Sequence, residues 1–270
     1  HTFGVDLLPA PGWNIGLTIM DAELDAIRGA VHRRAYGISA GRTDPRVQWA
    51  SKLEYRRDSG AEQRDQWVTT NRLMWRVNED WRVALRANHA RTRDRLGAYD
   101  ETELSEVNLG FAWRPHGGTR WAAFGRYTYL YDLASSGQVG GARNDQRSHV
   151  LAFEGIRQLD ERWQVAGKFA SRRGEYRMGR GTGEWLDSRA TLAALQLRLR
   201  LRYEWDALAE FRRLDVADGG KRDGWLLGVD RHIGGNFKIG IGYNFTSFSD
   251  DLTDLEYDHR GWFLNFAGWY

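Results

Sequence analysis

Alternation of apolar residues with polar or small residues at every second position runs through nearly the whole chain. Between Phe237 and Thr246, five apolar or aromatic residues at odd positions alternate with Lys, Gly, Gly, Asn and Thr. Successive side chains of an extended strand point to opposite faces, so this pattern predicts strands with one apolar face and one polar face. The same alternation recurs in residues 13–19, 47–55, 81–85, 107–113, 121–131 and 163–169.

The pattern predicts about fourteen strands. They are expected at residues 12–20, 31–42, 45–57, 64–77, 80–93, 104–114, 119–131, 144–158, 162–173, 187–201, 205–214, 222–232, 235–248 and 259–270. This is about two thirds of the chain, whereas soluble globular domains average about 20–25% strand. A closed antiparallel transmembrane β-barrel removes this objection, and the all-β barrel is the predicted fold class.

The predicted connections alternate in length. Links of two to four residues near 43–44, 78–79, 115–118, 160–161, 202–204 and 233–234 alternate with longer segments at 21–30, 58–63, 94–103, 132–143, 174–186, 215–221 and 249–258. Short periplasmic turns and longer extracellular loops are typical of outer-membrane barrels. Residues 1–11, with Pro9 and Pro11, are expected to form an N-terminal tether, and residues 12–270 the barrel. Because the chain opens at His1 without an initiator Met, a mature or excised form is expected.

Large aromatic residues directly follow several of the short turns. Four tryptophans are separated by 40, 42 and 42 residues, and a phenylalanine takes the equivalent place in the next hairpin. Aromatic residues at this depth form the interfacial belt of a membrane barrel. The predicted aromatic girdle is Trp81, Trp121, Trp163, Trp205 and Phe237.

A soluble repeat fold is the main alternative. A spacing near 42 residues and the Trp205-Asp206 pair resemble propeller blades, which have four short strands per repeat. Here each period contains two long strands, and a soluble sheet would have to bury many arginines. The barrel is therefore the preferred interpretation.

Charged residues, mostly arginine, occupy the polar face. The chain has 39 basic residues, of which four are lysine, against 36 acidic residues. Such side chains are costly against acyl chains, so they are expected to point into the barrel. One interpretation is that they pair across strands and stiffen the wall, and the other is a pore that favours anions. The predicted pore-lining residues are Lys52, Glu54, Arg72, Arg86, Arg126, Glu154, Lys168, Arg198, Arg200, Glu210 and Arg212.

Several function classes lack support in the sequence. Without cysteine there is no disulfide framework, thiol nucleophile or zinc–thiolate site. The seven histidines lie in no catalytic or metal-binding motif, so an enzyme, a cofactor and a metal are not expected. Net charge is only +3 without a basic stripe, which argues against nucleic acid, and the mean hydropathy is −0.63, without any apolar run long enough for a transmembrane helix. The acidic segment 249–258 is interpreted as a solvated outer loop, with cation binding or cation bridging to lipid head groups as alternatives.

The C-terminus carries the most specific motif. Every second residue counted back from the last one forms an apolar or aromatic stripe that ends on a terminal tyrosine. This stripe resembles the signal by which barrel-assembly machinery recognises its clients. The predicted assembly signal is Trp262, Leu264, Phe266, Gly268 and Tyr270.

A family resemblance extends from about residue 31 onward. It is carried by the strings Thr128–Leu133, Asp145–Gly155, Trp205–Arg212, Gly242–Leu255 and Gly261–Asn265. They resemble the C-terminal outer-membrane barrel module of long Gram-negative surface proteins, in which repetitive adhesin-like domains precede the barrel. The resemblance implies an anchoring or translocating barrel in the outer membrane, but no substrate and no catalytic residues. The expected partners are lipid and lipopolysaccharide, the assembly machinery and an upstream passenger or repeat domain; a free-standing porin-like channel with an anion-leaning lumen is the alternative.

Overall fold

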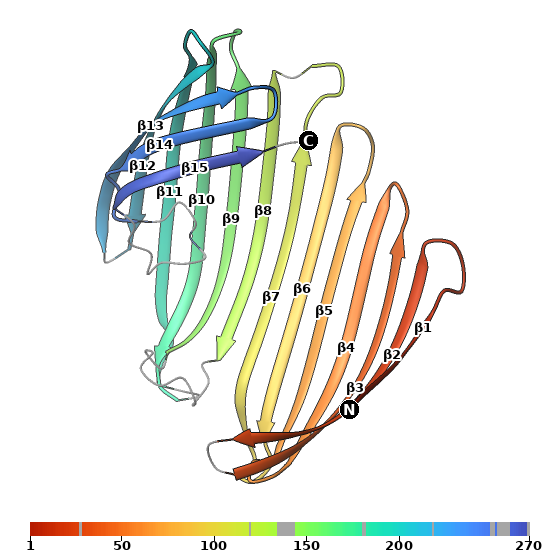
Figure 1. Ribbon diagram of the computed structural model, residues 1–270. Helices are drawn as coiled ribbons and strands as arrows, with labels where there is room; N and C mark the ends of the chain where they lie inside the picture. The colour runs from red at the N-terminus through yellow and green to blue at the C-terminus, as the bar shows by residue number, and fades with distance from the viewer. Residues whose placement is uncertain are drawn as a thin grey trace. The chain divides into compact units, whose positions relative to one another are not determined.

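The computed structural model describes residues 1–26, 29–118, 120–133, 144–179, 182–217, 219–248, 252 and 260–268. In these ranges, fifteen strands form one antiparallel sheet whose order follows the chain from first to last (Figure 1). This sequential order differs from the separate four-stranded blades of the propeller alternative. Within the described ranges, no helix has the length and apolar character needed to span a membrane.

Most strands are long. The strands are β1 (Thr2–Leu7), β2 (Trp13–Ala26), β3 (Gly29–Thr43), β4 (Val47–Gly60), β5 (Arg64–Arg76), β6 (Trp81–Asp94), β7 (Tyr99–Trp113), β8 (Trp121–Leu133), β9 (Asn144–Gln158), β10 (Trp163–Met178), β11 (Leu186–Arg200), β12 (Trp205–Val216), β13 (Gly220–Ile233), β14 (Phe237–Asn244) and β15 (Gly261–Gly268). Strands β2 to β13 have 12 to 16 residues, in agreement with the predicted long strands.

The strand count exceeds the predicted fourteen because β1 lies inside the segment expected to be a tether. Phe3 pairs with Ile19, Val5 with Leu17 and Leu7 with Ile15 in the antiparallel register of β1 and β2. Residues 2–7 therefore continue the apolar alternation of the sheet. The prolines at positions 9 and 11 follow β1 and fall in its link to β2, so they do not interrupt the strand.

The predicted alternation of short and long connections is only partly correct. Four of the segments expected to be long, at 21–30, 58–63, 94–103 and 215–221, are at least half strand, so their connections are short. These strand ends continue with polar residues that form cross-strand ion pairs, such as Arg91 with Asp100 and Lys221 with Asp215. The paired strands continue beyond the last apolar residue of the alternating pattern. Hydrophobic periodicity therefore predicts strands that are too short at these links.

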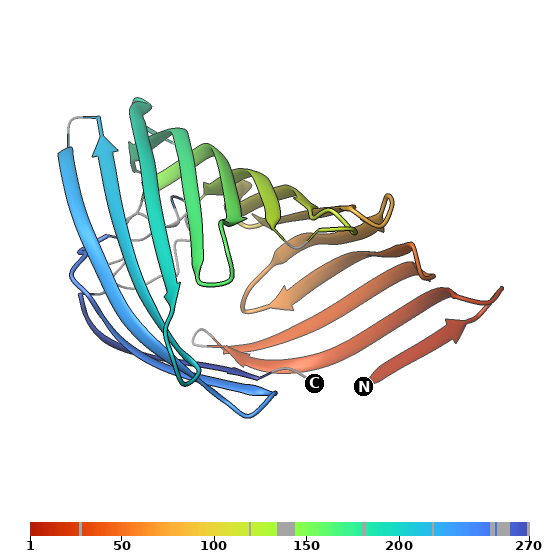
Figure 2. The same cartoon turned by 90° about the horizontal axis from the view of Figure 1, so that it is seen from above.

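The chain divides into two compact units. One contains residues 1–111, 127–149 and 174–187, and the other contains 112–126, 150–173 and 188–270. In the first unit, β1 to β6 lie side by side in chain order, in red to yellow in both views (Figures 1 and 2). In the second unit, β12 to β15 continue the same antiparallel pattern.

Candidate functional site: two opposite faces of one sheet

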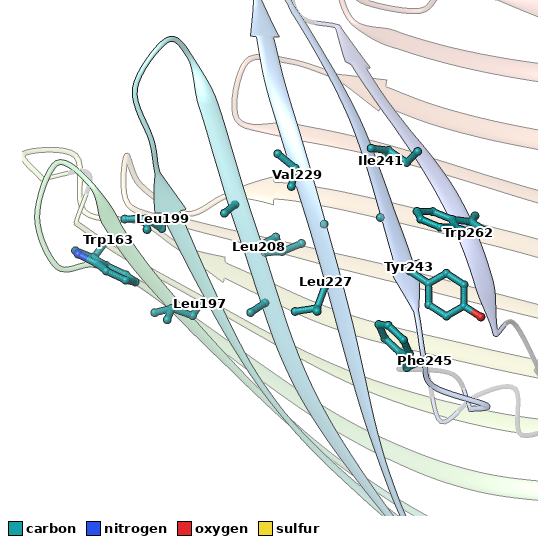
Figure 3. A pocket seen from close by; sticks show the side chains of 14 residues that line it. Trp163, Leu197, Leu199, Leu208, Leu227, Val229, Ile241, Tyr243, Phe245 and Trp262 are labelled. Atoms are coloured by element: carbon teal, nitrogen blue, oxygen red, sulfur yellow. The ribbon is translucent and has the colours of Figure 1, made fainter.

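The apolar face of the sheet consists of exposed side chains. In β14, Phe237, Ile239 and Ile241 are each about half exposed, whereas Lys238 and Gly240 between them are buried. In the second unit, a shallow apolar hollow of about 610 Å³ lies between neighbouring strands β10 to β15. Figure 3 shows its labelled side chains, which include Trp163, Leu197, Leu227, Val229, Ile241 and Trp262. An apolar surface continuous over many strands is unusual for a protein in water.

The five predicted girdle residues all occupy one kind of position. They are the first residues of β6, β8, β10, β12 and β14, directly after a link, and their side chains are 37–49% exposed. Trp13 holds the same position at the start of β2 and is 37% exposed. It is absent from the predicted girdle, in which each residue follows a short turn, because the segment before it is predicted to be a tether. Arginines of the neighbouring strands lie over Trp13, Trp121 and Trp205, with guanidinium-to-ring distances of 4.6–5.5 Å. Their role as an interfacial girdle stays a prediction.

Three of the links predicted to be short are closed by one side-chain motif, which Asp94 also forms in the link between β6 and β7. The Oδ1 atoms of Asp44, Asn78 and Asp160 each accept hydrogen bonds from the backbone N–H groups two and three residues later, at 2.7–2.9 Å. These bonds lower the pKa of Asp44 and of Asp160, since the donors stabilise the charged carboxylate. The side chain thus satisfies backbone donors that the tight link leaves free.

The predicted assembly stripe lies on the apolar face as far as the structure describes it. Trp262, Leu264 and Phe266 are 71–80% exposed and pair with Tyr243, Ile241 and Ile239 of β14. Gly268 ends β15 opposite Phe237, whereas Tyr270 lies outside the described residues. Recognition of this stripe by an assembly machinery stays a prediction.

The polar face of the first unit contains an ion-pair network towards the ends of the strands. Lys52 Nζ lies 2.7 Å from Glu54 Oε2, and the Arg56 guanidinium also contacts Glu54. Arg33 forms a bidentate pair with buried Asp58 at 2.7 and 2.8 Å. The Arg33–Asp58 pair joins β3 to β4, with the bidentate geometry that arginine and carboxylate favour, whereas Lys52, Glu54 and Arg56 all belong to β4. Charged residues of this face therefore pair within a strand as well as across strands, whereas only pairing across strands was predicted.

The polar face of the second unit is also paired. Glu210 is buried and accepts hydrogen bonds from Gln196, at 2.7 Å, and from Arg212. Asp206 contacts His232 at 2.9 Å and Arg200 at 3.8 Å. The remaining predicted pore residues of this unit, Arg126, Glu154, Lys168 and Arg198, lie on β8, β9, β10 and β11.

Arg72 and Arg86 differ from the other predicted pore residues of the first unit. They are opposite each other in the register of β5 and β6, and both are exposed. Both line a polar groove of about 660 Å³ on the first unit. Other side chains at this groove are Asn14, Ser39, Lys52, Thr70 and Asn88.

A buried apolar cluster in the second unit is absent from the features predicted from the sequence. Its members are Val150, Ala170, Ala190, Leu192, Leu214, Phe248 and Leu252. Leu192 is fully buried and lies three positions before exposed Leu195, so its side chain points to the opposite face of the strand. Such even-numbered apolar residues in β11 and β12 were the available signal. Leu252 belongs to the acidic segment 249–258, of which only this residue is described, and its burial differs from the expectation of a wholly solvated loop.

No group of three or more potential metal ligands is present among the described residues. Most of the acidic segment 249–258, the one place where cation binding was considered, lies outside those residues.

The comparisons with known proteins identify the fold. No protein family matches the chain, and no curated protein sequence matches it. The siderophore receptor PirA of Pseudomonas aeruginosa is similar in structure, with a TM-score of 0.57 and 12% identity over 88% of this chain and 46% of the receptor. PirA of Acinetobacter baumannii has a TM-score of 0.53 and 12% identity over 90% of this chain and 43% of the receptor. The ferric enterobactin receptor PfeA of P. aeruginosa has a TM-score of 0.54 and 9% identity over 86% of this chain and 43% of the receptor.

These structural neighbours are outer-membrane β-barrels. The predicted all-β architecture of antiparallel strands in one sheet is confirmed at the level of fold, whereas closure of this sheet into a barrel stays a prediction. At such low identity the likeness concerns the fold alone, and this chain spans less than half the length of the receptors. The specific resemblance to the barrel module of repeat-containing surface proteins stays a prediction.

Proposed function

We propose that the chain is an integral outer-membrane β-barrel of a Gram-negative bacterium that closes on itself and anchors an attached surface domain. The observation that carries this proposal is the exposure of the apolar stripe, seen in Phe237, Ile239 and Ile241, opposite a charged face. Transfer of such apolar side chains from water into lipid is favourable, and a lipid-facing surface of this kind is typical of membrane barrels. The siderophore receptors of similar fold support the barrel assignment.

The proposed partners follow from the same two faces. Acyl chains of lipid and lipopolysaccharide would cover the apolar face. The predicted aromatic girdle, together with Trp13, would lie at the membrane interface. The barrel-assembly machinery would recognise the predicted assembly signal, whose described side chains on β15 are exposed, during insertion. An upstream passenger or repeat domain would be the attached cargo, as the family resemblance implies. The proposed role is not enzymatic.

A diffusion channel that favours anions is the second candidate. The polar groove bordered by Arg72 and Arg86 favours it, because these exposed cations lie on the water-facing side of the proposed wall. The ion pairs of Glu54 and Glu210 favour the anchor, because charges that neutralise each other do not attract permeant ions.

Refolding the chain into planar bilayers separates the two candidates. Steady openings with a reversal potential that favours chloride under a KCl gradient are the result expected for the channel. A protein that inserts and migrates anomalously on unheated gels but stays electrically silent is the result expected for the anchor. Failure to insert into any bilayer, with the chain demonstrably folded in detergent, would contradict both.

A further inference from the structure

Four arginines form a ladder on the polar face of two adjacent strands in the first unit. In the β5–β6 register, Arg72 pairs with Arg86 and Arg76 pairs with Arg82. The two pairs share one parity, and all four side chains are exposed. The strand rise of about 3.4 Å per residue places the two pairs about 14 Å apart along the sheet. We call Arg72, Arg76, Arg82 and Arg86 the arginine ladder.

The ladder lacks the acidic partners that other polar-face charges have. None of the four arginines forms an ion pair within the part of the chain that the structure describes, and the one polar contact of Arg72 is with Met74 Sδ at 3.4 Å. Elsewhere on the polar face, Arg33 and Arg212 each contact a carboxylate. Like charges directly opposite each other destabilise a sheet, so two such pairs in sequence carry a cost that bound anions would remove.

Neutral hydrogen-bonding groups extend the ladder into the polar groove. Thr70 and Asn88 form the next cross-strand pair of the same parity after Arg72 and Arg86, and both line the groove. Beyond them, the carboxylate of Glu106 accepts hydrogen bonds from Asn88, at 3.2 Å, and from Asn108, at 2.6 Å. The acidic residues of the β5–β6 link, Glu79 and Asp80, precede the strand that carries Arg82. Amide and hydroxyl groups beside guanidinium groups suit the oxygens of an anion.

We propose that the arginine ladder binds a linear polyanion whose phosphate or carboxylate groups repeat along its length. A single small anion occupies one arginine pair, whereas an extended chain contacts both pairs and the groove beyond Arg72. Bidentate contacts of guanidinium with phosphate or carboxylate oxygens supply the affinity. Release of counterions makes this affinity fall steeply as salt concentration rises.

The proposal goes beyond membrane anchoring and rests on the proposed function only in requiring that water reaches the polar face. Binding is therefore measured on the folded chain in non-ionic detergent, where neither insertion nor conduction is needed. Folding is established separately by anomalous migration on unheated gels and by β-sheet circular dichroism. Loss of binding and failure of the barrel proposal are then distinguishable results.

Calorimetric titration with a short linear polyphosphate, and with orthophosphate as the single-centre comparison, tests the ladder. We expect polyphosphate to bind more tightly than orthophosphate, and R72Q/R86Q and R76Q/R82Q each to weaken polyphosphate binding by about tenfold or more, because charge-assisted hydrogen bonds are lost. The matched control R57Q/R213Q removes the same charge from exposed arginines that lie near Asp65 and Asp223. We expect this control to bind polyphosphate as the wild type does.

Three results would overturn the proposal: equal weakening in the control, no polyphosphate binding by the folded wild type, or full competition by an anionic phospholipid, which would make a lipid head group the ligand. A measurement on the wild type covers the case that a ladder variant does not fold. Polyphosphate is expected to protect Arg72, Arg76, Arg82 and Arg86 from phenylglyoxal, as mapped by mass spectrometry, and to leave Arg57 reactive. Equal reactivity of all five with and without polyphosphate would contradict the ladder.

Discussion

Lys238 Nζ lies 2.6 Å from Asp230 Oδ2, and both side chains are about nine-tenths buried on the polar face of the second unit. Gly240 is opposite Asp230 in the register, and a Cβ atom there would meet Asp230 Oδ1 at 1.9 Å. The glycine thus leaves the space in which the buried pair forms.

Removal of one partner of this pair is expected to destabilise the fold strongly. Lys238→Met leaves Asp230 buried without its cation, and we expect a loss of about 3–5 kcal/mol in the free energy of unfolding. The control is Lys52→Met, whose ammonium is half exposed beside Glu54, for which we expect less than about 1 kcal/mol. Denaturant unfolding of the chain in lipid vesicles measures both, and equal losses would contradict the assigned burial.

Asp44 and Asp160, which close two of the links, predict a specific acid sensitivity. Hydrogen bonding lowers the pKa of Asp44 and Asp160 in the folded state, so their stabilising effect is complete above the ordinary value of 3.8 and is lost as the pH falls through the lowered value. The D44N/D160N variant keeps the acceptor, as Asn78 does in its own link, but does not titrate. The free energy of unfolding, measured against pH, should fall for the wild type relative to the variant as the pH drops below 3.8. Parallel curves for the two proteins would show that these carboxylates do not titrate as described.

The buried apolar cluster of the second unit predicts a large effect at one leucine. Leu192 is fully buried among Val150, Ala170 and Leu214, so Leu192→Ala should cost about 2–5 kcal/mol through the cavity that it leaves. Leu192→Met conserves volume, and we expect a loss below about 1.5 kcal/mol. Unfolding in vesicles by denaturant checks both variants. A small loss for the alanine variant would mean that the cluster is not packed.

A glycine of β14 accommodates an aromatic ring of β15. A Cβ atom at Gly242 would lie 2.3 Å from Phe263 Cζ and 2.6 Å from the Leu227 carbonyl oxygen. Gly242→Ala should therefore destabilise the last hairpin by about 1–3 kcal/mol through overpacking. At Gly155 no described atom lies within 4 Å of such a Cβ, so Gly155→Ala is the matched control and should be close to neutral. Similar effects of the two substitutions on thermal unfolding would refute this packing.

The features predicted correctly from the sequence are those with a period of two. Exposed Ile239 and Ile241, with Lys238 and Gly240 buried beside them, follow from alternation alone, because strand geometry fixes the face of each residue. Strand β1 is absent from the prediction because Pro9 and Pro11 indicate an extended tether, although Phe3, Val5 and Leu7 alternate with other residues before them. The partners of Lys238 and Arg33 depend on register, and Leu192 depends on packing between distant segments. Neither is encoded in local periodicity.

The chain lacks cysteine, so single labels can be placed along β11 without background. Nitroxides at Leu195→Cys, Gln196→Cys, Leu197→Cys and Arg198→Cys of the vesicle-inserted protein test the central claim, that the apolar face contacts lipid. We expect positions 195 and 197 to be accessible to oxygen, which partitions into lipid, and positions 196 and 198 to a water-soluble nickel complex. Oxygen accessibility without the two-residue period, or a reversed phase, would contradict the account.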